Sequence, residues 1–151
     1  MDTAYKTTLE LDKVLARAVQ LCTCRETKAM MQALQPFDTV EEERYALAQT
    51  NAVNALLIKN GSPRFGSVNE VRRVVAHAQK GGILSMGELL EIAATLRNFA
   101  GLNQWYGLSE HEMLPTDDLF YALAPQPVLE RQISESILSP DEMADTASVT
   151  L

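Results

Sequence analysis

Apolar residues recur at helical spacing over most of the chain. The clearest stripe follows Ser85 and comprises Met86, Leu89, Leu90, Ala93, Leu96 and Ala100. Two further stripes have the same spacing: Leu11, Val14, Leu15, Ala18 and Cys22 form one, and Leu47, Ala48, Ala52, Ala55 and Ile58 form the other. Residues three or four positions apart share one face of a helix. The pattern predicts an all-α fold, a multi-helix bundle of amphipathic helices.

Capping motifs mark the predicted helix boundaries. Thr39, Ser67 and Ser85 are each followed three residues later by a glutamate, the spacing of a capping box that begins a helix. Asn60-Gly61 and Lys80-Gly81-Gly82 are typical of helix C-termini, because these residue types tolerate the left-handed conformation found there or favour the last turn. The helix that starts at Ser67 is expected to bury a stripe of Val68, Val71, Val75 and Ala78.

The C-terminal third carries weaker signals. Thr116 is a candidate N-cap for a short helix that ends before Pro125, and a further helix is predicted over residues 128–138. Trp105 and Tyr106 close the strongest helix, and we expect their rings to cap the core, with a docking surface as the alternative. The sequence predicts one helical domain over residues 1–138, with its clearest bundle over 7–106, weaker helices over 116–138, and a connection toward further domains over 139–151.

The stretch GSPRFGS, residues 61–67, contains part of a phosphate-binding loop. Gly61 and Gly66 have the glycine spacing of G-x-x-x-x-G-K-[ST] and Ser67 supplies the hydroxyl, but the lysine is absent. A phosphate loop also follows a buried strand, whereas the segment before Gly61 has helical spacing. A helix-to-helix connection is the favoured interpretation, with weak anion binding at the next helix N-terminus as the alternative.

Composition limits the partners that the chain can bind. Of its 151 residues, 46% are hydrophobic, and 20 acidic against 13 basic residues give a net charge of −7. An acidic surface repels nucleic-acid phosphates, so DNA contact would need a local basic patch. No signal peptide or membrane-spanning run is recognisable, and two cysteines make no disulfide scaffold. We therefore expect a cytoplasmic protein with no membrane partner.

Signals for catalysis or metal binding are weak. Cys22 and Cys24 could bind zinc with His77 and His111, but the C-x-C spacing is atypical of structural zinc sites. Free thiols and solvated histidines are the favoured interpretation. Residues 41–43 are three glutamates in a first helical turn, which the helix dipole explains. No nucleophile has a recognisable partner, so we predict no catalytic, cofactor-binding or metal-binding residue.

One concentration of basic residues is a candidate contact surface. Arg72, Arg73 and Lys80 belong to the helix predicted after Ser67, and Arg64 precedes it. Such a patch contacts a phosphate backbone or an acidic partner, although a solvated helix face has the same composition. We call these four residues the basic patch.

The order of segments resembles the bacterial MutS-two family, MutS paralogues that carry a C-terminal Smr nuclease domain. The resemblance is carried by LELDKVLARAVQLCTCRETKAMMQALQP near the start, Lys80-Gly-Gly-Ile-Leu-Ser85, the ELLEIAATLR helix from Glu88 to Arg97, and Asp145-Thr-Ala-Ser148. Asn69-Glu70 departs from the arginine-aspartate usual in the family, and residues 108–127 show little of its pattern.

The resemblance implies a structural role for this chain. Family members are several times longer, with ATP-binding motifs and the Smr nuclease beyond the position of residue 151, so no catalytic residue carries over. It implies an N-terminal helical core fragment of a DNA-binding ATPase and endonuclease of DNA recombination and repair. ATP and Mg are implied for that parent, and the implied partners are its remaining domains, a second subunit, and branched DNA or the ribosome. The alternative is a stand-alone helical adaptor that binds another protein through an apolar groove.

Overall fold

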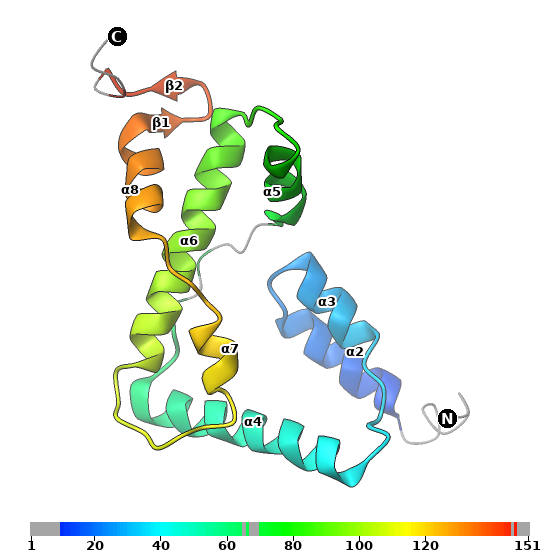
Figure 1. The fold of residues 1–151 in the computed structure, drawn as a ribbon. Coiled ribbons are helices and arrows are strands. Elements are labelled where there is room, and N and C mark those ends of the chain that lie inside the picture. The colour runs from blue at the N-terminus through cyan, green and yellow to red at the C-terminus, as the bar shows by residue number, and fades with distance from the viewer. Residues whose placement is uncertain (1–9, 65, 67–69, 146, 148–151) are drawn as a thin grey trace. The chain divides into compact units, whose positions relative to one another are not determined.

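The computed structural model describes residues 10–64, 66, 70–145 and 147, and these residues are mostly helical (Figure 1). A two-stranded sheet accompanies the helices, so the all-α prediction is confirmed. Contacts between Cα atoms divide the chain into two compact units, Met1–Pro36 and Phe37–Leu151. This division is finer than the single domain predicted over residues 1–138, and the folding of both units as one domain stays a prediction.

The first unit contains two helices, α2 (Leu11–Leu21) and α3 (Arg25–Gln32). Cys24 is the N-cap of α3, and its Sγ accepts a hydrogen bond from the backbone N–H of Thr27 at 3.4 Å. No described residue of this unit is buried, and Leu21 is 83% exposed. The two helices pack on each other, but they enclose no core of their own.

Two long helices organise the second unit, α4 (Val40–Asn60) and α6 (Met86–Tyr106). The capping boxes predicted at Thr39 and Ser85 are confirmed, since each hydroxyl accepts the backbone N–H three residues on and each glutamate accepts the cap N–H. Helix α4 ends at Gly61, whose φ of 72° lies in the left-handed region.

Helix α5 (Arg72–Gln79) begins later than predicted. Residues 67–69 of the expected capping box lie outside the described residues, and Glu70 and Val71 are not helical. The helix ends at Lys80-Gly81-Gly82 as predicted, with φ 80° at Gly81. Val75 and Ala78 were expected in the core but are exposed, because α5 makes no extensive contact with another helix of the described part of the chain.

A first hydrophobic cluster lies where α4 meets the C-terminal end of α6. Leu56, Trp105 and Tyr106 are its buried members, and Phe120 of α7 (Asp117–Tyr121) packs against them. Trp105 is 6% exposed, and its indole N–H donates to the Gly61 carbonyl oxygen at 2.8 Å. The two rings therefore cap the core, as the sequence predicts. We call this group the α4–α6 cluster.

A second cluster lies along the N-terminal half of α6. Ala93 packs with Ile133 of α8 (Pro127–Ser136) and with Ile137 of strand β1 (Ile137–Ser139). Partly buried apolar residues of α6 complete it: Met86, Leu89, Leu90 and Ile92. Figure 1 shows α8 running beside α6 at this end, while α4 crosses its other end. We call this group the α6–α8 cluster.

The inward face of α4 is not the face that its apolar spacing indicates. Of the predicted stripe, Leu47, Ala48 and Ala55 are exposed and Ile58 is 80% exposed. The less exposed residues are Ala46, Gln49, Ala52, Val53, Leu56, Leu57 and Asn60, so Ala52 is the member of the predicted stripe that lies among them. Gln49 faces inward because its side-chain amide donates to the Pro115 carbonyl oxygen at 3.0 Å. The inward face of α4 thus combines apolar residues of the core cluster with one polar side chain whose hydrogen bond is satisfied.

The helix predicted over residues 128–138 stops at Ser136, and a short hairpin follows. Strand β1 pairs antiparallel with β2 (Glu142–Met143). Pro140 disfavours helical backbone at the residue before it, and the backbone N–H of Asp141 donates to Ser139 Oγ within the turn. The first part of the connection predicted over residues 139–151 is therefore part of this hairpin.

Replacing Ile133 by alanine tests the α6–α8 cluster. Ile133 is 7% exposed, so Ile133→Ala should lower the free energy of unfolding by about 2–4 kcal/mol through lost packing. Val128 lies on the same helix but is 59% exposed, so Val128→Ala should change it by less than about 0.5 kcal/mol. Urea unfolding followed by circular dichroism measures both. Equal effects of the two substitutions would contradict the assigned packing.

Candidate functional site

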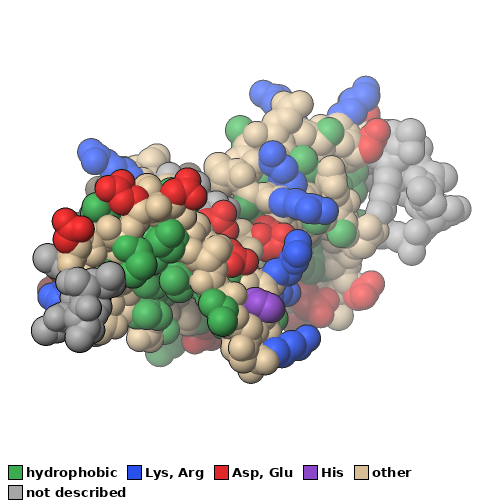
Figure 2. All heavy atoms as spheres, turned by 90° about the horizontal axis from the view of Figure 1, so that it is seen from above, with side chains coloured by type: hydrophobic (Ala, Val, Ile, Leu, Met, Phe, Trp, Pro, Cys, Tyr) green, Lys and Arg blue, Asp and Glu red, His purple; other side chains and the backbone are tan. Residues whose placement is uncertain are grey.

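A hollow with charged walls lies between α5 and the start of α6. Its volume is about 670 Å³, and its ionisable lining residues are Glu70, Arg73, His77, Lys80, Glu88 and Glu91. Residues 73, 77 and 80 occupy one face of α5 and its C-terminal cap, because they are three or four positions apart. Figure 2 shows basic side chains close to a histidine, with acidic side chains also on that face. The hollow therefore presents charges of both signs.

The structure brings together only part of the basic patch. Arg73 and Lys80 line the hollow, whereas Arg72 and Arg64 are not among its lining residues. Consecutive residues of a helix point in directions about 100° apart, which separates Arg72 from Arg73. No ion pair joins any of these four to another described residue. Three glutamates line the same hollow, so its surroundings are unlike the uniformly positive footprint of a nucleic-acid site.

His77 is exposed, as predicted, but its ring also lies against the backbone of the following turn. A Cβ atom placed on Gly82 would collide with the imidazole. Gly82 therefore provides space, whereas its neighbour Gly81 provides a left-handed backbone. The histidine also contributes to a lowered pKa of Glu88, whose chief cause is the hydrogen bond from the Ser85 backbone N–H. His77 at the end of α5 and Glu88 at the start of α6 thus line the same hollow.

A second polar group lies around Tyr106, at the far end of α6. The tyrosine hydroxyl donates to Asp117 Oδ1 at 2.6 Å and lies 2.8 Å from the Thr116 hydroxyl oxygen. Asp117 Oδ2 accepts the backbone N–H of Leu114 at 3.1 Å. Thr116 is fully buried and occupies the N-cap position of α7, as predicted, but its side chain makes no capping hydrogen bond and its hydroxyl faces Tyr106 instead. The hydroxyl of Tyr106 thus holds the loop that leads into α7.

His111 packs on the ring of Tyr106 instead of being simply solvated, which corrects the prediction for this histidine. The two ring centroids are 4.8 Å apart in an edge-on arrangement. The hydrogen bond from Tyr106 is the main cause of the lowered pKa of Asp117, and the nearby His111 adds to it. Burial, with the hydrogen bond to Asp117, raises the pKa of Tyr106 to about 12. Sequence reasoning missed this group because its members are brought together by tertiary packing.

The stretch from Gly61 to Gly66 connects two helices, as predicted, and α4 stands where a phosphate loop requires a strand. Two of its backbone groups have partners on α6. The Gly61 carbonyl oxygen accepts the Trp105 indole N–H, and the Gly66 N–H donates to Asn98 Oδ1 at 3.1 Å. Phe65 and Ser67 lie outside the described residues. Without a strand and without the phosphate-loop lysine, nucleotide binding is not supported here.

The residues weighed as zinc ligands belong to two different units of the chain. Cys22 and Cys24 are both free thiols, and His77 and His111 lie in the other unit. Over residues 10–64, 66, 70–145 and 147, no three His, Cys, Asp or Glu side chains are grouped so as to hold a metal ion. Among the same residues, no helix has both the length and the apolar character needed to cross a membrane.

Known proteins similar to this chain are named as MutS2 endonucleases. Endonuclease MutS2 of Clostridium beijerinckii is 32% identical over 145 residues, which are 95% of this chain and 18% of that protein. Endonuclease MutS2 of Clostridium botulinum strain Eklund 17B is 31% identical over the same shares. No family model matches the chain. No solved structure matches it significantly either.

The chain is therefore similar to one segment of MutS2 endonucleases and spans less than a fifth of their length. This agrees with the family resemblance in the sequence at the level of a related segment. Because the match covers 95% of the chain, it includes residues of both compact units.

Removing the hydroxyl of Tyr106 tests the polar group at the end of α6. Tyr106→Phe should lower the free energy of unfolding near neutral pH by about 2 kcal/mol, because Thr116 and Asp117 lose a partner. Tyr121→Phe is the control, since that ring is 71% exposed, and it should cost less than about 0.5 kcal/mol.

The cost of Tyr106→Phe should depend on pH at both extremes. The pKa of Asp117 is lowered on folding, so its contribution is present above the ordinary value of 3.8 and is lost as the pH falls through the folded pKa. The pKa of Tyr106 is raised, so its contribution is present below 10.0 and is lost as the pH rises through about 12. Urea unfolding from pH 2 to 12 measures the difference. A difference that stays constant over this range would contradict the hydrogen bond.

Proposed function

We propose that this chain is the N-terminal helical core segment of a MutS2-like protein and that its role is structural and coupling. The observation that carries the proposal is the similarity over 95% of this chain to 18% of a MutS2 endonuclease. The segment serves as a rigid group of packed helices against which neighbouring domains pack. The hydroxyl groups that donate to carboxylates, such as Ser85 to Glu88 and Tyr106 to Asp117, hold helix ends and the loop before α7, which supports a mechanical role.

Helix α6 is the element suited to coupling. Its 21 residues form a rod about 30 Å long, with one hydrophobic cluster at each end. A displacement of α4 at one end therefore moves α8 and the hairpin at the other end, because packed elements shift as rigid bodies.

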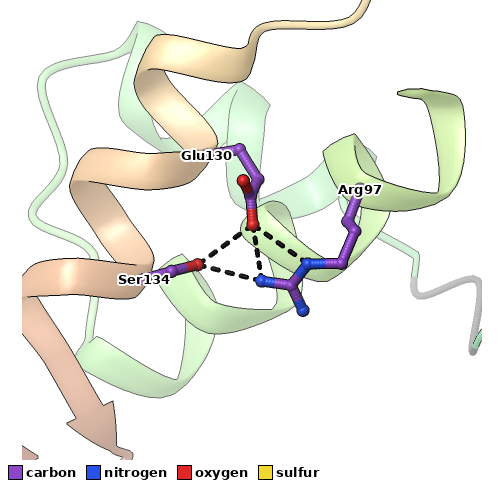
Figure 3. A network of polar contacts seen from close by, with 3 residues as sticks. All are labelled: Arg97, Glu130 and Ser134. Carbon is purple, nitrogen blue, oxygen red and sulfur yellow. Dashed lines mark hydrogen bonds and ion pairs between the residues drawn. The ribbon is translucent and has the colours of Figure 1, made fainter. Parts of the chain in front are cut away.

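A polar network fixes α8 on α6 beside the second cluster. In Figure 3, Arg97 of α6 points toward Glu130 and Ser134, which lie one turn apart on α8. Arg97 Nε donates to Glu130 Oε1 at 3.0 Å, and its Nη2 donates to Ser134 Oγ at 3.0 Å. Ser134 Oγ in turn donates to Glu130 Oε1. The exposed ion pair adds little stability, but the two bonds from one guanidinium fix the rotation of α8 about its own axis.

The activities of the whole protein are proposed to reside outside this segment. The parent would be a DNA-binding ATPase and endonuclease that uses ATP and Mg and acts on branched DNA or the ribosome in the cytoplasm. Its remaining domains and a second subunit would be the immediate partners. Within this segment, the basic patch of Arg64, Arg72, Arg73 and Lys80 is proposed to contact an acidic partner surface. The glutamates beside Arg73 and Lys80 weaken the attraction of this patch for a phosphate backbone and for an acidic protein surface alike, so the contact is proposed to be a modest one.

A stand-alone adaptor is the second candidate function. It is favoured by an uncharged hollow of about 380 Å³ with Leu57, Trp105 and Phe120 among its lining residues, which suits an apolar protein partner. Under this alternative, the chain acts alone and the similarity to a longer endonuclease reflects common structure only.

A chimera separates the two candidate functions. In Endonuclease MutS2 of Clostridium beijerinckii, the matched segment is replaced by this chain, and cleavage of branched DNA is compared with a variant that lacks the segment. The isolated chain should hydrolyse no ATP and cut no DNA. The chimera should retain endonuclease activity at least tenfold above the deletion variant. Hydrolysis by the isolated chain, or a chimera no better than the deletion, would contradict the proposed role.

A further inference from the structure

An apolar groove runs along α4 and α7 in the second unit. Two adjoining hollows of about 380 and 520 Å³ share Val53, Leu57 and Leu119 as lining residues. One end is apolar, with Trp105 and Phe120 in its wall. The other end is polar but uncharged, with Gln49 and Asn54 among its lining residues. We call the two hollows together the α4–α7 groove.

No charged side chain of the residues that the structure describes lines the α4–α7 groove. This is notable in a chain with 20 acidic and 13 basic residues, because a solvated surface would carry some of them. A phosphate backbone has no cation to bind here, and an acidic or basic peptide has no counter-charge. Leu119 of the shared wall is 57% exposed, so its side chain is available to a partner. The groove therefore suits an uncharged, largely apolar surface.

Hydrogen bonds between elements fix the walls of the groove. Asn103 Nδ2 donates to the Leu123 carbonyl oxygen at 2.6 Å and joins α6 to the end of α7. Gln49 Nε2 donates to the Pro115 carbonyl oxygen and joins α4 to the loop before α7. The indole of Trp105 is bound to the Gly61 carbonyl oxygen. The groove is thus preformed, and binding need not order its walls.

We propose that the α4–α7 groove receives an amphipathic helix from the part of a MutS2-like protein that lies outside this segment. The inference rests on the proposed function. More than four fifths of each similar endonuclease lies outside the matched segment, so the polypeptide that would cover the groove is available in the same protein. Covalent linkage raises the local concentration of that helix, so a modest apolar contact is sufficient.

The form of the groove favours a helix over other occupants. Its walls are helices whose backbone groups bond internally, so they offer no edge to an extended strand. A helix needs no backbone partner and inserts side chains at i, i+3, i+4 and i+7. Large apolar anchors of this helix would lie near Trp105 and Phe120, and small uncharged polar residues would lie near Gln49 and Asn54.

Chemical labelling of a thiol in the groove wall tests this inference. Leu119→Cys is made both in the isolated chain and in the chimera described above. The rate at which its thiol reacts with a maleimide is measured by mass spectrometry of the peptide that contains residue 119, which separates it from the native cysteines. The thiol should react at least tenfold more slowly in the chimera, because the helix covers it. Leu138→Cys is the matched control, since Leu138 is 60% exposed on β1, outside the groove. Its two rates should agree within about threefold.

Three outcomes would overturn the inference. Leu119→Cys could react equally fast in the two proteins, or its reaction in the isolated chain could slow with rising protein concentration, which would identify a second copy as the occupant. Equal protection of both thiols would show general burial without a groove partner. The labelling rates can be measured whether or not the chimera cuts DNA, so this test is independent of the test of the proposed function. An active chimera with an unprotected Leu119→Cys thiol would reject the groove helix and leave the proposed function standing.

Discussion

The packing of α6 against two separate groups of side chains is the constraint on which the second unit depends. Trp105 and Tyr106 fix its C-terminal end on α4, and Ala93 fixes its N-terminal half on Ile133 and Ile137. Between these clusters the helix is continuous from Met86 to Tyr106. Helices α4 and α8 and the loop before α7 are positioned by their contacts with α6. Helix α5 is instead connected to α6 chiefly by the turn at its C-terminal end.

This arrangement explains where polar chemistry occurs and why it is structural. The carboxylate of Asp117 accepts both the Tyr106 hydroxyl and the Leu114 N–H, so its hydrogen-bonding capacity serves the loop. Glu88 is similarly engaged by Ser85 at the helix start. Among the described residues, the groups with shifted pKa values are Glu88, Tyr106 and Asp117, and each hydrogen bonds to a residue at a helix end or in the loop before α7.

The sequence predicted helix boundaries better than helix faces. Capping at Thr39 and Ser85 involves only neighbouring residues, so the box pattern was sufficient. The inward face of α4 includes Gln49, whose hydrogen-bond partner Pro115 is 66 positions away, and apolar spacing contains no information about that contact. The turn at Pro140 was visible as a proline, but pairing of Ile137 with Met143 depends on a register that single-sequence patterns do not define.

The candidate site shows the same limit. A run of basic residues in the sequence predicted one patch, yet the helical turn separates Arg72 from Arg73, and tertiary packing places Glu88 and Glu91 beside Lys80. The contact of His111 with Tyr106 had no local signal, since the intervening segment is irregular. The sequence shows which residues carry charge, but the fold determines which of these charges lie close together.

The placement of the aromatic rings has a spectroscopic consequence. Trp105 is the one tryptophan of the chain, and it belongs to the α4–α6 cluster, whereas the α6–α8 cluster has no aromatic member among its described residues. The fluorescence of Trp105 thus reports on the C-terminal end of α6 and does not report on its N-terminal half. If melting begins at the α8 end, backbone ellipticity falls while emission holds steady, so paired optical traces distinguish the two ends of a single helix without any added label.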